Sequence, residues 1–305
     1  MTESVLVLMA AHNGLPFIRA QLDSVLDQAG VAVEVRVSDD NSTDGTAAYL
    51  ATVAQADRRL SLETRPAAVG YPQAFFDLIA QTEPAPDQWV AFCDQDDVWV
   101  ADKLVTQCRQ ARRHQVGGVS SSITSVYPNG RRVLVRKDRP QRRFDFIGET
   151  PGPGATFLLS PPAYALVANY VRTHADALAG LGFHDTLIYA LVRAAGLGWY
   201  IDPRPTIDYR QHAGNAMGAN IGWQATRKRA QMLSSGWYRQ QFARLTAAAL
   251  AVCTPDLTTD LTVLSALLRR HDLSARLRLA GWCPQLRRRR RDQVILAAGV
   301  VLGRW

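Results

Sequence analysis

The sequence predicts an α/β protein built around a sheet whose first strands are parallel. Over the first 115 residues, short apolar runs alternate with segments whose apolar residues recur at helical spacing. The run Val5–Met9 shows no polar alternation, as expected for a strand buried on both faces. The expected strands are 5–9, 33–37, 60–63 and 89–93, and the expected helices are 17–28, 44–56, 71–81 and 99–114. A regular alternation of this kind is typical of a doubly wound sheet.

The pattern changes after residue 115. The segments Val119–Val126 and Arg132–Val135 flank an Asn129-Gly130 pair, which is a strong hairpin signal. Further helices are expected at 162–169 and 185–195, and short strands at 198–201 and 206–209. From residue 222 the chain is helical and basic in character. We therefore predict a mixed sheet flanked by helices in a domain over residues 1–221, and a helical, basic extension over residues 222–305.

Composition narrows the classes of protein and partner. The chain has 305 residues, of which 47% are hydrophobic and 20% charged, as in ordinary globular proteins. A formal net charge of +8 favours an anionic partner such as a nucleotide, a nucleic acid or a membrane surface. The four cysteines form no CxxC pair, which favours a reduced, cytoplasmic setting. No apolar stretch reaches the roughly 18 residues that span a bilayer.

Three expected strands end in polar segments: AAHNG at 10–14, SDDNSTDGT at 38–46 and DQDD at 94–97. Open parallel sheets bind ligands beyond the carboxyl ends of their strands, so these segments line one cleft if the strands are neighbours. Each segment also has a local explanation. Asn-Gly is common in turns, and Ser42, Thr43 or Asp44 could cap the following helix.

The DQDD segment is the hardest to explain by local structure. It places three carboxylates in four residues between an apolar strand and Val98-Trp99. Like charges at this spacing repel, so solvent or a cation must compensate them. Hard divalent cations such as Mg²⁺ take one or two carboxylates together with substrate phosphates. The segment therefore indicates a metal-assisted phosphate site.

Taken in order, AAHNG, QLDSVLDQ at 21–28, SDDNSTDGT and CDQDDVW at 93–99 resemble the motif set of the family 2 glycosyltransferases. These are inverting enzymes of the GT-A fold that use nucleotide-sugar donors. The DQDDVW form is most similar to the rhamnosyltransferase branch of bacterial polysaccharide and O-antigen synthesis. The resemblance covers about residues 4 to 215, and it extends to Gly182-Phe183-His184-Asp185 and to the YRQHAGN segment at 209–215.

The resemblance implies a set of roles for the site residues. The implied nucleotide-sugar contacts are Ala10, Ala11, His12, Asn13, Asp39, Asp40, Gly70, Asp94 and Gln95. Asp96 and His212 are the implied ligands of Mg²⁺ or Mn²⁺, and Asp185 is the implied catalytic base. Gly154, Ala155, Thr156, His184 and Arg210 belong to the region of the acceptor and the donor sugar. The chain departs from the family at His12, where an aromatic residue is commoner, and at Ala68-Val69-Gly70, where Asn-x-Gly is usual.

The implied activity is the transfer of a sugar onto a cell-surface polysaccharide or a lipid-linked glycan. The branch resemblance suggests dTDP-L-rhamnose as donor, and a UDP-sugar stays open as the alternative. A metal-dependent nucleotidyltransferase, which also gathers carboxylates around Mg²⁺, is a second alternative. Nucleic-acid binding is disfavoured, because no binding motif is present and acidic strand ends repel phosphate backbones.

The basic C-terminus predicts contact with a membrane surface. Arg287–Arg291 is a run of five arginines, followed by the apolar segment Val294–Leu302 and by Trp305. Such a segment attaches to an anionic leaflet through its arginines and an embedded apolar face, although a solvated helix face is the simpler explanation. We expect a peripheral protein on the inner membrane face. We also expect that deletion from Arg287 onward releases it while short soluble acceptors still react.

Overall fold

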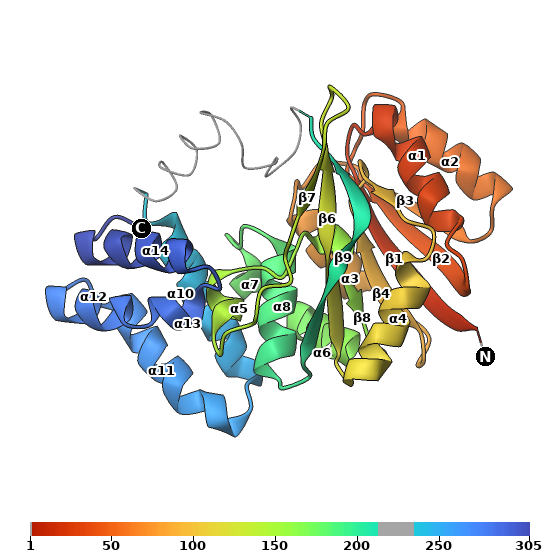
Figure 1. The fold of residues 1–305 in the computed structure, drawn as a ribbon. Helices are drawn as coiled ribbons and strands as arrows, with labels where there is room; N and C mark the ends of the chain where they lie inside the picture. Colours follow the sequence, from red (N-terminus) through yellow and green to blue (C-terminus); the bar gives the residue numbers. More distant parts are fainter. Residues whose placement is uncertain (1, 213–234) are drawn as a thin grey trace. The chain divides into compact units, whose positions relative to one another are not determined.

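The computed structural model describes residues 2–212 and 235–305, and these form two compact units (Figure 1). The first, here called the sheet unit, comprises Met1–Asp138, Gly152–Ala179 and Leu197–Gln211. The second, here called the helical unit, comprises Arg139–Pro151, Gly180–Gly196 and His212–Trp305. Two internal segments of the chain therefore group with the C-terminal helices. The predicted boundary at 221/222 lies outside the described residues.

The described strands of the sheet unit form one mixed sheet in the order β3-β2-β1-β4-β8-β6-β9-β5, with β7 paired to β6. The strands β1, β2, β3 and β4 are parallel, whereas β8 runs antiparallel to β4 and β6, and β5 runs antiparallel to β9. The predicted mixed sheet is thus confirmed. The strands are β1 Glu3–Ala11, β2 Val31–Asp39, β3 Leu60–Thr64, β4 Trp89–Cys93, β5 Val98–Trp99, β6 Gly118–Val126, β7 Arg132–Val135, β8 Leu158–Leu159 and β9 Trp199–Arg210.

Helices pack on both faces of the central strands. Val5, Val7 and Met9 of β1 are fully buried in a cluster with residues of α1 and α4, and the intervening Leu6 and Leu8 are buried on the other face. This double burial explains why β1 reads as a continuous apolar run. The helices of the sheet unit are α1 Leu15–Leu26, α2 Thr46–Ala56, α3 Gln73–Gln81, α4 Lys103–His114, α6 Pro161–Thr173 and α7 Ala175–Leu178, with the 3₁₀ turn η1 Gly154–Thr156.

The register of the parallel strands aligns their carboxyl ends. Ala11 of β1 lies opposite Asp39 of β2, and Met9 of β1 lies opposite Cys93 of β4. The polar segments that follow these three strands therefore begin at the same edge of the sheet, as the sequence predicts.

The helical unit is built from amphipathic helices that bury leucine-rich faces. Leu257, Leu261 and Leu264 of α11 are buried, and Leu245 and Ala249 of α10 are buried in the same unit. Its helices are α5 Asp145–Gly148, α8 His184–Ala194, α10 Trp237–Val252, α11 Pro255–Arg269, α12 Leu273–Ala280, α13 Cys283–Leu286 and α14 Arg290–Leu302. None of the helices in the described ranges is long and apolar enough to cross a membrane.

Most predicted elements are present, and three details differ. The helix expected to start at Trp99 starts at Lys103, because Val98–Trp99 pairs with β9 as a strand. The strands expected at 198–201 and 206–209 are one strand, β9, with irregular pairing between them. The N-cap of α2 is Gly45 at φ 98°, not Ser42, Thr43 or Asp44. The hairpin at Tyr127–Gly130 forms as predicted.

Candidate active site

The loop after β1 is fastened to the loop after β4 by one side chain. The amide of Gln95 accepts a hydrogen bond from the His12 backbone N–H at 2.7 Å and donates one to the His12 carbonyl at 2.8 Å. A Cβ on Gly14 would lie 2.2 Å from Gln95 Oε1, so Gly14 leaves the space that this pair occupies. The Gln95 side chain thus connects two segments of the predicted cleft through hydrogen bonds to the backbone.

The loops after β1 and β2 are joined by a set of side-chain hydrogen bonds. The Asn13 backbone N–H donates to Ser42 Oγ at 2.9 Å, and Asn13 Oδ1 accepts from the Thr43 N–H at 2.8 Å. The Leu15 N–H donates to Asp44 Oδ2 at 3.0 Å, which places an acidic side chain against the start of α1. These bonds hold Asn13 at φ 51°, in the left-handed region that asparagine tolerates better than most residues.

The two acidic residues at the end of β2 have different surroundings. Both carboxylate oxygens of the buried Asp40 accept backbone hydrogen bonds, from Val69 N–H at 2.8 Å and from Gly70 N–H at 2.7 Å. Asp39 is fully buried, and its Oδ2 accepts from the Ser42 N–H at 3.0 Å. Asp39 Oδ1 has no hydrogen-bond partner among the described residues. Asp40 therefore holds the loop before Tyr71, and Asp39 has one buried carboxylate oxygen to which the described residues donate no hydrogen bond.

The residues of the acidic segment after β4 differ in how far they are buried. Asp94, Gln95 and Asp96 are partly exposed, whereas Asp97 is fully buried. Asp97 Oδ1 accepts from the Arg210 backbone N–H at 3.2 Å, as expected of a structural acceptor. Burial, together with the charges of Asp96 and Asp94, raises the pKa of Asp97 well above its usual range. The exposed pair Asp94 and Asp96 is the part of the segment that can meet a ligand.

These residues fit a divalent cation that shares its coordination with a substrate. No group of three or more histidine, cysteine, aspartate or glutamate side chains within residues 2–212 and 235–305 is arranged to hold a metal. A Mg²⁺ ion bound with phosphates needs only one or two carboxylates. Asp94 and Asp96, both partly exposed, supply the one or two carboxylates that such a donor set needs.

The remaining predicted residues of the sheet unit lie at two places. Arg210 ends β9, and its guanidinium donates to the Asp97 carbonyl at 3.2 Å and lies over the Phe17 ring. Gly154, Ala155 and Thr156 are buried in η1, where the Thr156 carbonyl accepts from Gln107 Nε2 at 2.6 Å. His212, partly exposed, follows β9 and belongs to the helical unit.

His184 and Asp185 open α8 in the helical unit. His184 is fully buried, and this burial lowers the pKa of its imidazole to about 3. Asp185 is 8% exposed and occupies the first turn, where the helix dipole favours a carboxylate. The sequence thus places a buried acidic side chain at a helix start.

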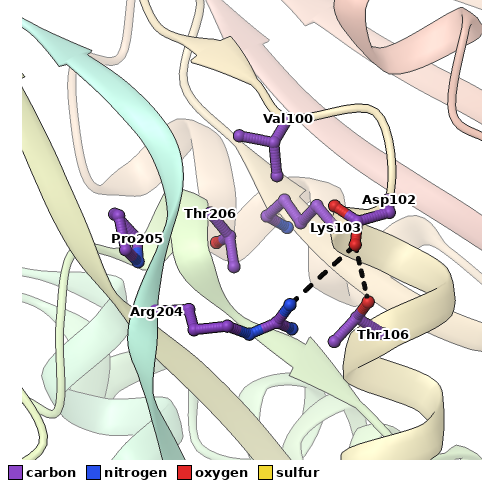
Figure 2. A pocket seen from close by; sticks show the side chains of 7 residues that line it. All are labelled: Val100, Asp102, Lys103, Thr106, Arg204, Pro205 and Thr206. Atoms are coloured by element: carbon purple, nitrogen blue, oxygen red, sulfur yellow. Dashed lines mark hydrogen bonds and ion pairs between the residues drawn. The ribbon is translucent and has the colours of Figure 1, made fainter.

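A separate hollow of about 300 Å³ lies beside the start of α4, at β9. Figure 2 shows Arg204 and Thr106 both directed at the Asp102 carboxylate, with Lys103 behind them. The residues that line it are Val100, Asp102, Lys103, Thr106, Arg204, Pro205 and Thr206. None of them belongs to the predicted site.

Comparison with known proteins identifies the family. The profile described as glycosyl transferase family 2 matches residues 6–163, more than half of the chain. The chain belongs to this family. The glycosyltransferase is 29% identical over 297 residues to "dTDP-rhamnosyl transferase RfbG" of Shigella flexneri, which covers 96% of this chain and 99% of that protein. This agrees with the predicted nucleotide-sugar-dependent glycosyl transfer.

Two further relatives cover less sequence or show the fold alone. "UDP-Glc:alpha-D-GlcNAc-diphosphoundecaprenol beta-1,3-glucosyltransferase WfgD" of Escherichia coli is 30% identical over 112 residues, 37% of this chain and 42% of that protein. The crystal structure of S. aureus TarS 1–349 in complex with UDP-GlcNAc matches 96% of this chain and 79% of that chain, with a TM-score of 0.58 and 16% identity. The match confirms the GT-A architecture of the glycosyltransferase.

Sequence reasoning missed the residues that hold the loops in place. Thr46 Oγ1 accepts from the Gly14 N–H at 2.9 Å, and Arg65 bridges Ser38 and Asp77 at 3.1 and 2.7 Å. A threonine after Asp-Gly signals a helix start, and nothing in the sequence links it to Gly14. Arg65 sits in an ordinary loop and carries no sequence signal for its partners.

Proposed function

We propose that this glycosyltransferase transfers L-rhamnose from dTDP-L-rhamnose to a glycan or lipid-linked acceptor by a single inverting displacement. The observation that carries the proposal is the similarity to the dTDP-rhamnosyl transferase RfbG, because it extends over nearly the full length of both chains. The joined loops after β1, β2 and β4 supply a polar edge at the carboxyl ends of parallel strands, where such sheets bind nucleotides.

The nucleotide is assigned to the loops of the sheet unit. The backbone of Ala10–Asn13 lies against the base, and Asp39 or Asp40 accepts a hydrogen bond from the pyrimidine N3–H. Asp39 Oδ1 is the better placed acceptor, because both Asp40 oxygens already hold Val69 and Gly70. Asp94, Gln95 and Gly70 complete the assigned contacts with the nucleotide sugar. Gln95 contributes by holding the His12 backbone with two hydrogen bonds.

A divalent cation, Mg²⁺ or Mn²⁺, is assigned to Asp96 with His212 from the segment after β9. When bound, it supplies electrostatic stabilisation for the negative charge that develops on the leaving diphosphate. The exposed carboxylate of Asp96 and the nearby charge of Asp94 support this assignment.

Asp185 is assigned as the base that removes the proton from the acceptor hydroxyl. Inversion requires one base on the face opposite the leaving group. His184, the adjacent residue, is fully buried at the start of α8, and burial lowers the pKa of its imidazole to about 3, so it is assigned to the surroundings of the site and not to the base. Gly154, Ala155, Thr156, His184 and Arg210 are assigned to the surroundings of the acceptor and the donor sugar.

The identity of the product tests the reaction. The purified chain is incubated with labelled dTDP-L-rhamnose or UDP-sugars, a lipid-linked or glycan acceptor, and Mg²⁺ or Mn²⁺. We expect free dTDP and a glycosylated acceptor from dTDP-L-rhamnose only. Turnover with a UDP-sugar alone would assign the donor to the other class, and release of pyrophosphate would indicate nucleotidyl transfer.

Two substitutions test the assigned residues. Asp96→Ala is expected to abolish both transfer and metal-dependent nucleotide binding. Asp185→Asn is expected to keep donor binding and to lower turnover by about 10²–10⁴-fold, since it removes only the base. Asp176→Asn, at an exposed carboxylate of α7, is the matched control and is expected to behave as the parent. Normal turnover by either test variant would remove that residue from the mechanism.

A peripheral membrane contact is assigned to α12 and α14 of the helical unit. These helices pack against one another and expose large apolar side chains: Leu273 and Leu277 on α12, and Val294, Ile295 and Leu302 on α14. Arg289, Arg290 and Arg291 are exposed at the start of α14. An apolar face flanked by arginines suits an anionic inner leaflet, where lipid-linked acceptors reside. Trp305 is 4% exposed and packs on Phe242, so it is not an embedded anchor.

A further inference from the structure

We propose that Arg288 is a positioning residue for α8, the helix that opens with His184 and Asp185; this rests on the proposed role of Asp185 as base. The run Arg287–Arg291 does not act as one charged surface. Arg289, Arg290 and Arg291 are exposed, whereas the side chain of Arg288 is 1% exposed and lies inside the helical unit. A buried guanidinium is costly unless it is paired, so its partners indicate its role.

The partners of Arg288 lie on and directly after α5. Its guanidinium lies 3.6 Å from Asp145 Oδ2 and 3.2 Å from Glu149 Oε1, and it also donates to the Thr150 carbonyl. The Arg288 backbone N–H donates to Glu149 Oε2 at 2.9 Å. Arg288 therefore fixes the segment 145–150 from the C-terminal part of the chain.

The same buried carboxylate holds α8. Tyr189 Oη donates to Asp145 at 3.1 and 3.2 Å to its two oxygens, and Arg193 Nη1 lies 3.2 Å from Asp145 Oδ1. Arg193 Nη1 also donates to Tyr189 Oη at 2.7 Å. Arg193 and Arg288 thus balance Asp145 and Glu149, and Asp145 couples Arg288 to two successive turns of α8.

The spacing of these contacts along α8 allows them to fix the position of the Asp185 carboxylate. Asp185, Tyr189 and Arg193 follow one another at intervals of four residues, so they lie along one side of α8. Two anchors one turn apart fix both the rotation and the axial position of the helix. A helix rotation of roughly 10° moves a carboxylate that lies several ångströms from the axis by about 1 Å. A misplacement of that size can cost about 100-fold in rate.

The backbone is shaped to bring Arg288 to this place. A Cβ on Gly148 of α5 would lie 2.4 Å from the Leu286 carbonyl of α13, a backbone atom that cannot move aside cheaply. The glycine therefore permits the close approach of α5 and α13 that sets Arg288 beside Asp145. The Gly148–Leu286 contact and the ion pairs of Arg288 thus both hold the segment 145–150 against the chain around Arg288.

Steady-state kinetics of Arg288→Met, with Arg269→Met as matched control, test the proposal. We expect Arg288→Met to lower kcat by about 10- to 100-fold and to leave KM for the nucleotide sugar within about threefold. Arg269→Met, at an exposed arginine of α11 in the same unit, is expected to match the parent in both constants. Circular dichroism and nucleotide binding establish that the variants are folded.

A double-variant comparison separates positioning from a general loss of structure. If Arg288 acts through Asp185, adding Arg288→Met to Asp185→Asn is expected to cause no further loss of kcat. Tyr189→Phe removes one hydrogen bond to Asp145 and keeps the ring. It is expected to lower kcat in the same direction by a smaller factor, and it replaces Arg288→Met if that variant does not fold.

The outcomes are distinguishable. Parental kcat in both Arg288→Met and Tyr189→Phe would overturn the positioning role, as would a full additional loss in the Asp185→Asn background. A loss expressed as raised donor KM with unchanged kcat would also overturn it. Full turnover by Asp185→Asn would instead refute the proposed base, whatever the result at Arg288.

Discussion

Lys103 begins α4 with a fully buried ammonium group for which the described residues provide no hydrogen-bond partner. Its Nζ lies 3.6 Å from the centre of the Trp99 ring, which compensates part of the lost hydration. Burial lowers the pKa of Lys103 to about 7, against the opposing influence of Cys93 and Cys108. The charged form is therefore unfavourable in the folded protein at neutral pH and below.

The sign of the resulting pH dependence follows from proton binding. In the unfolded chain the pKa of a lysine is about 10.4. Between pH 7 and that value the unfolded chain binds more protons at this position than the folded chain. The contribution of Lys103 to the free energy of unfolding therefore rises as pH increases through this window, and it is unfavourable below pH 7.

Lys103→Met is expected to stabilise the protein more at pH 6 than at pH 9, with a difference of about 2–3 kcal/mol between the two effects. Methionine keeps an unbranched apolar stem without the charge. Urea unfolding of parent and variant at the two pH values gives the comparison. Arg109→Met, on the exposed side of the same helix, is the control and is expected to show no such difference. Equal effects of Lys103→Met at both pH values would contradict the prediction.

At the scale of elements, the site depends on loops that fasten one another. The loop after β1 receives hydrogen bonds from side chains of the β2 and β4 loops, and Asp40 in turn holds the loop before α3. The backbone to which we assign the nucleotide is thus held in place by hydrogen bonds within the protein itself. Such preorganisation lowers the conformational cost of binding.

Gly14→Ala is expected to weaken nucleotide binding by about 10-fold, the equivalent of roughly 1.4 kcal/mol. The new methyl group would occupy the place of Gln95 Oε1 and break both hydrogen bonds to His12. Calorimetric titration with the nucleoside diphosphate measures the change. Gln95→Ala removes the same bonds and is expected to give a similar loss, and the double variant no more than either one. Fully additive losses would show that the two residues act separately.

The elements of the first 115 residues could be predicted because β1 and β4 are continuous apolar runs buried on both faces and the helices between the strands each bury one apolar side. The start of α4 could not, because Val98 and Trp99 become a strand only by pairing with β9, more than a hundred residues later. The site residues at strand ends could be located for a similar reason: parallel register puts chain-distant ends together. The partners of Asp40 could not, since Val69 and Gly70 contribute backbone N–H groups that leave no trace in side-chain pattern.

At the scale of the whole molecule, we assign two separate roles to the basic C-terminus. Arg288 belongs to the interior of the helical unit, and its exposed neighbours are available for a surface. Deletion from Arg287 onward would remove both, leaving Asp145 with Arg193 as its remaining ion-pair partner and removing the guanidinium that pairs with Glu149. The sequence led us to expect that this deletion leaves activity on short soluble acceptors intact. We now expect it to disturb the helical unit as well, so point substitutions are the better test of membrane contact.

Replacing Arg289, Arg290 and Arg291 together by glutamine is expected to lower the affinity for anionic vesicles by about 10- to 100-fold, since each arginine contributes about 1 kcal/mol at the surface. Sedimentation with vesicles that contain phosphatidylglycerol, compared with pure phosphatidylcholine, measures it. The control replaces Arg109, Arg112 and Arg113, three exposed arginines of α4, by glutamine. Equal binding by both triple variants would refute the assignment of this surface.

The contacts that Arg288 and Asp145 make with α8 also bear on the order in which the helical unit folds during synthesis. Arg193 precedes Arg288 by 95 residues (288 − 193) and Asp145 precedes it by 143 (288 − 145), so Arg288 leaves the ribosome at least roughly 5–20 s after the other members of the cluster. Throughout that interval the nascent chain holds a carboxylate cluster that lacks one of its two guanidiniums. Under the proposed positioning role, α8 reaches its final setting only after Arg288 has emerged, when all strands of the sheet unit have already been synthesised.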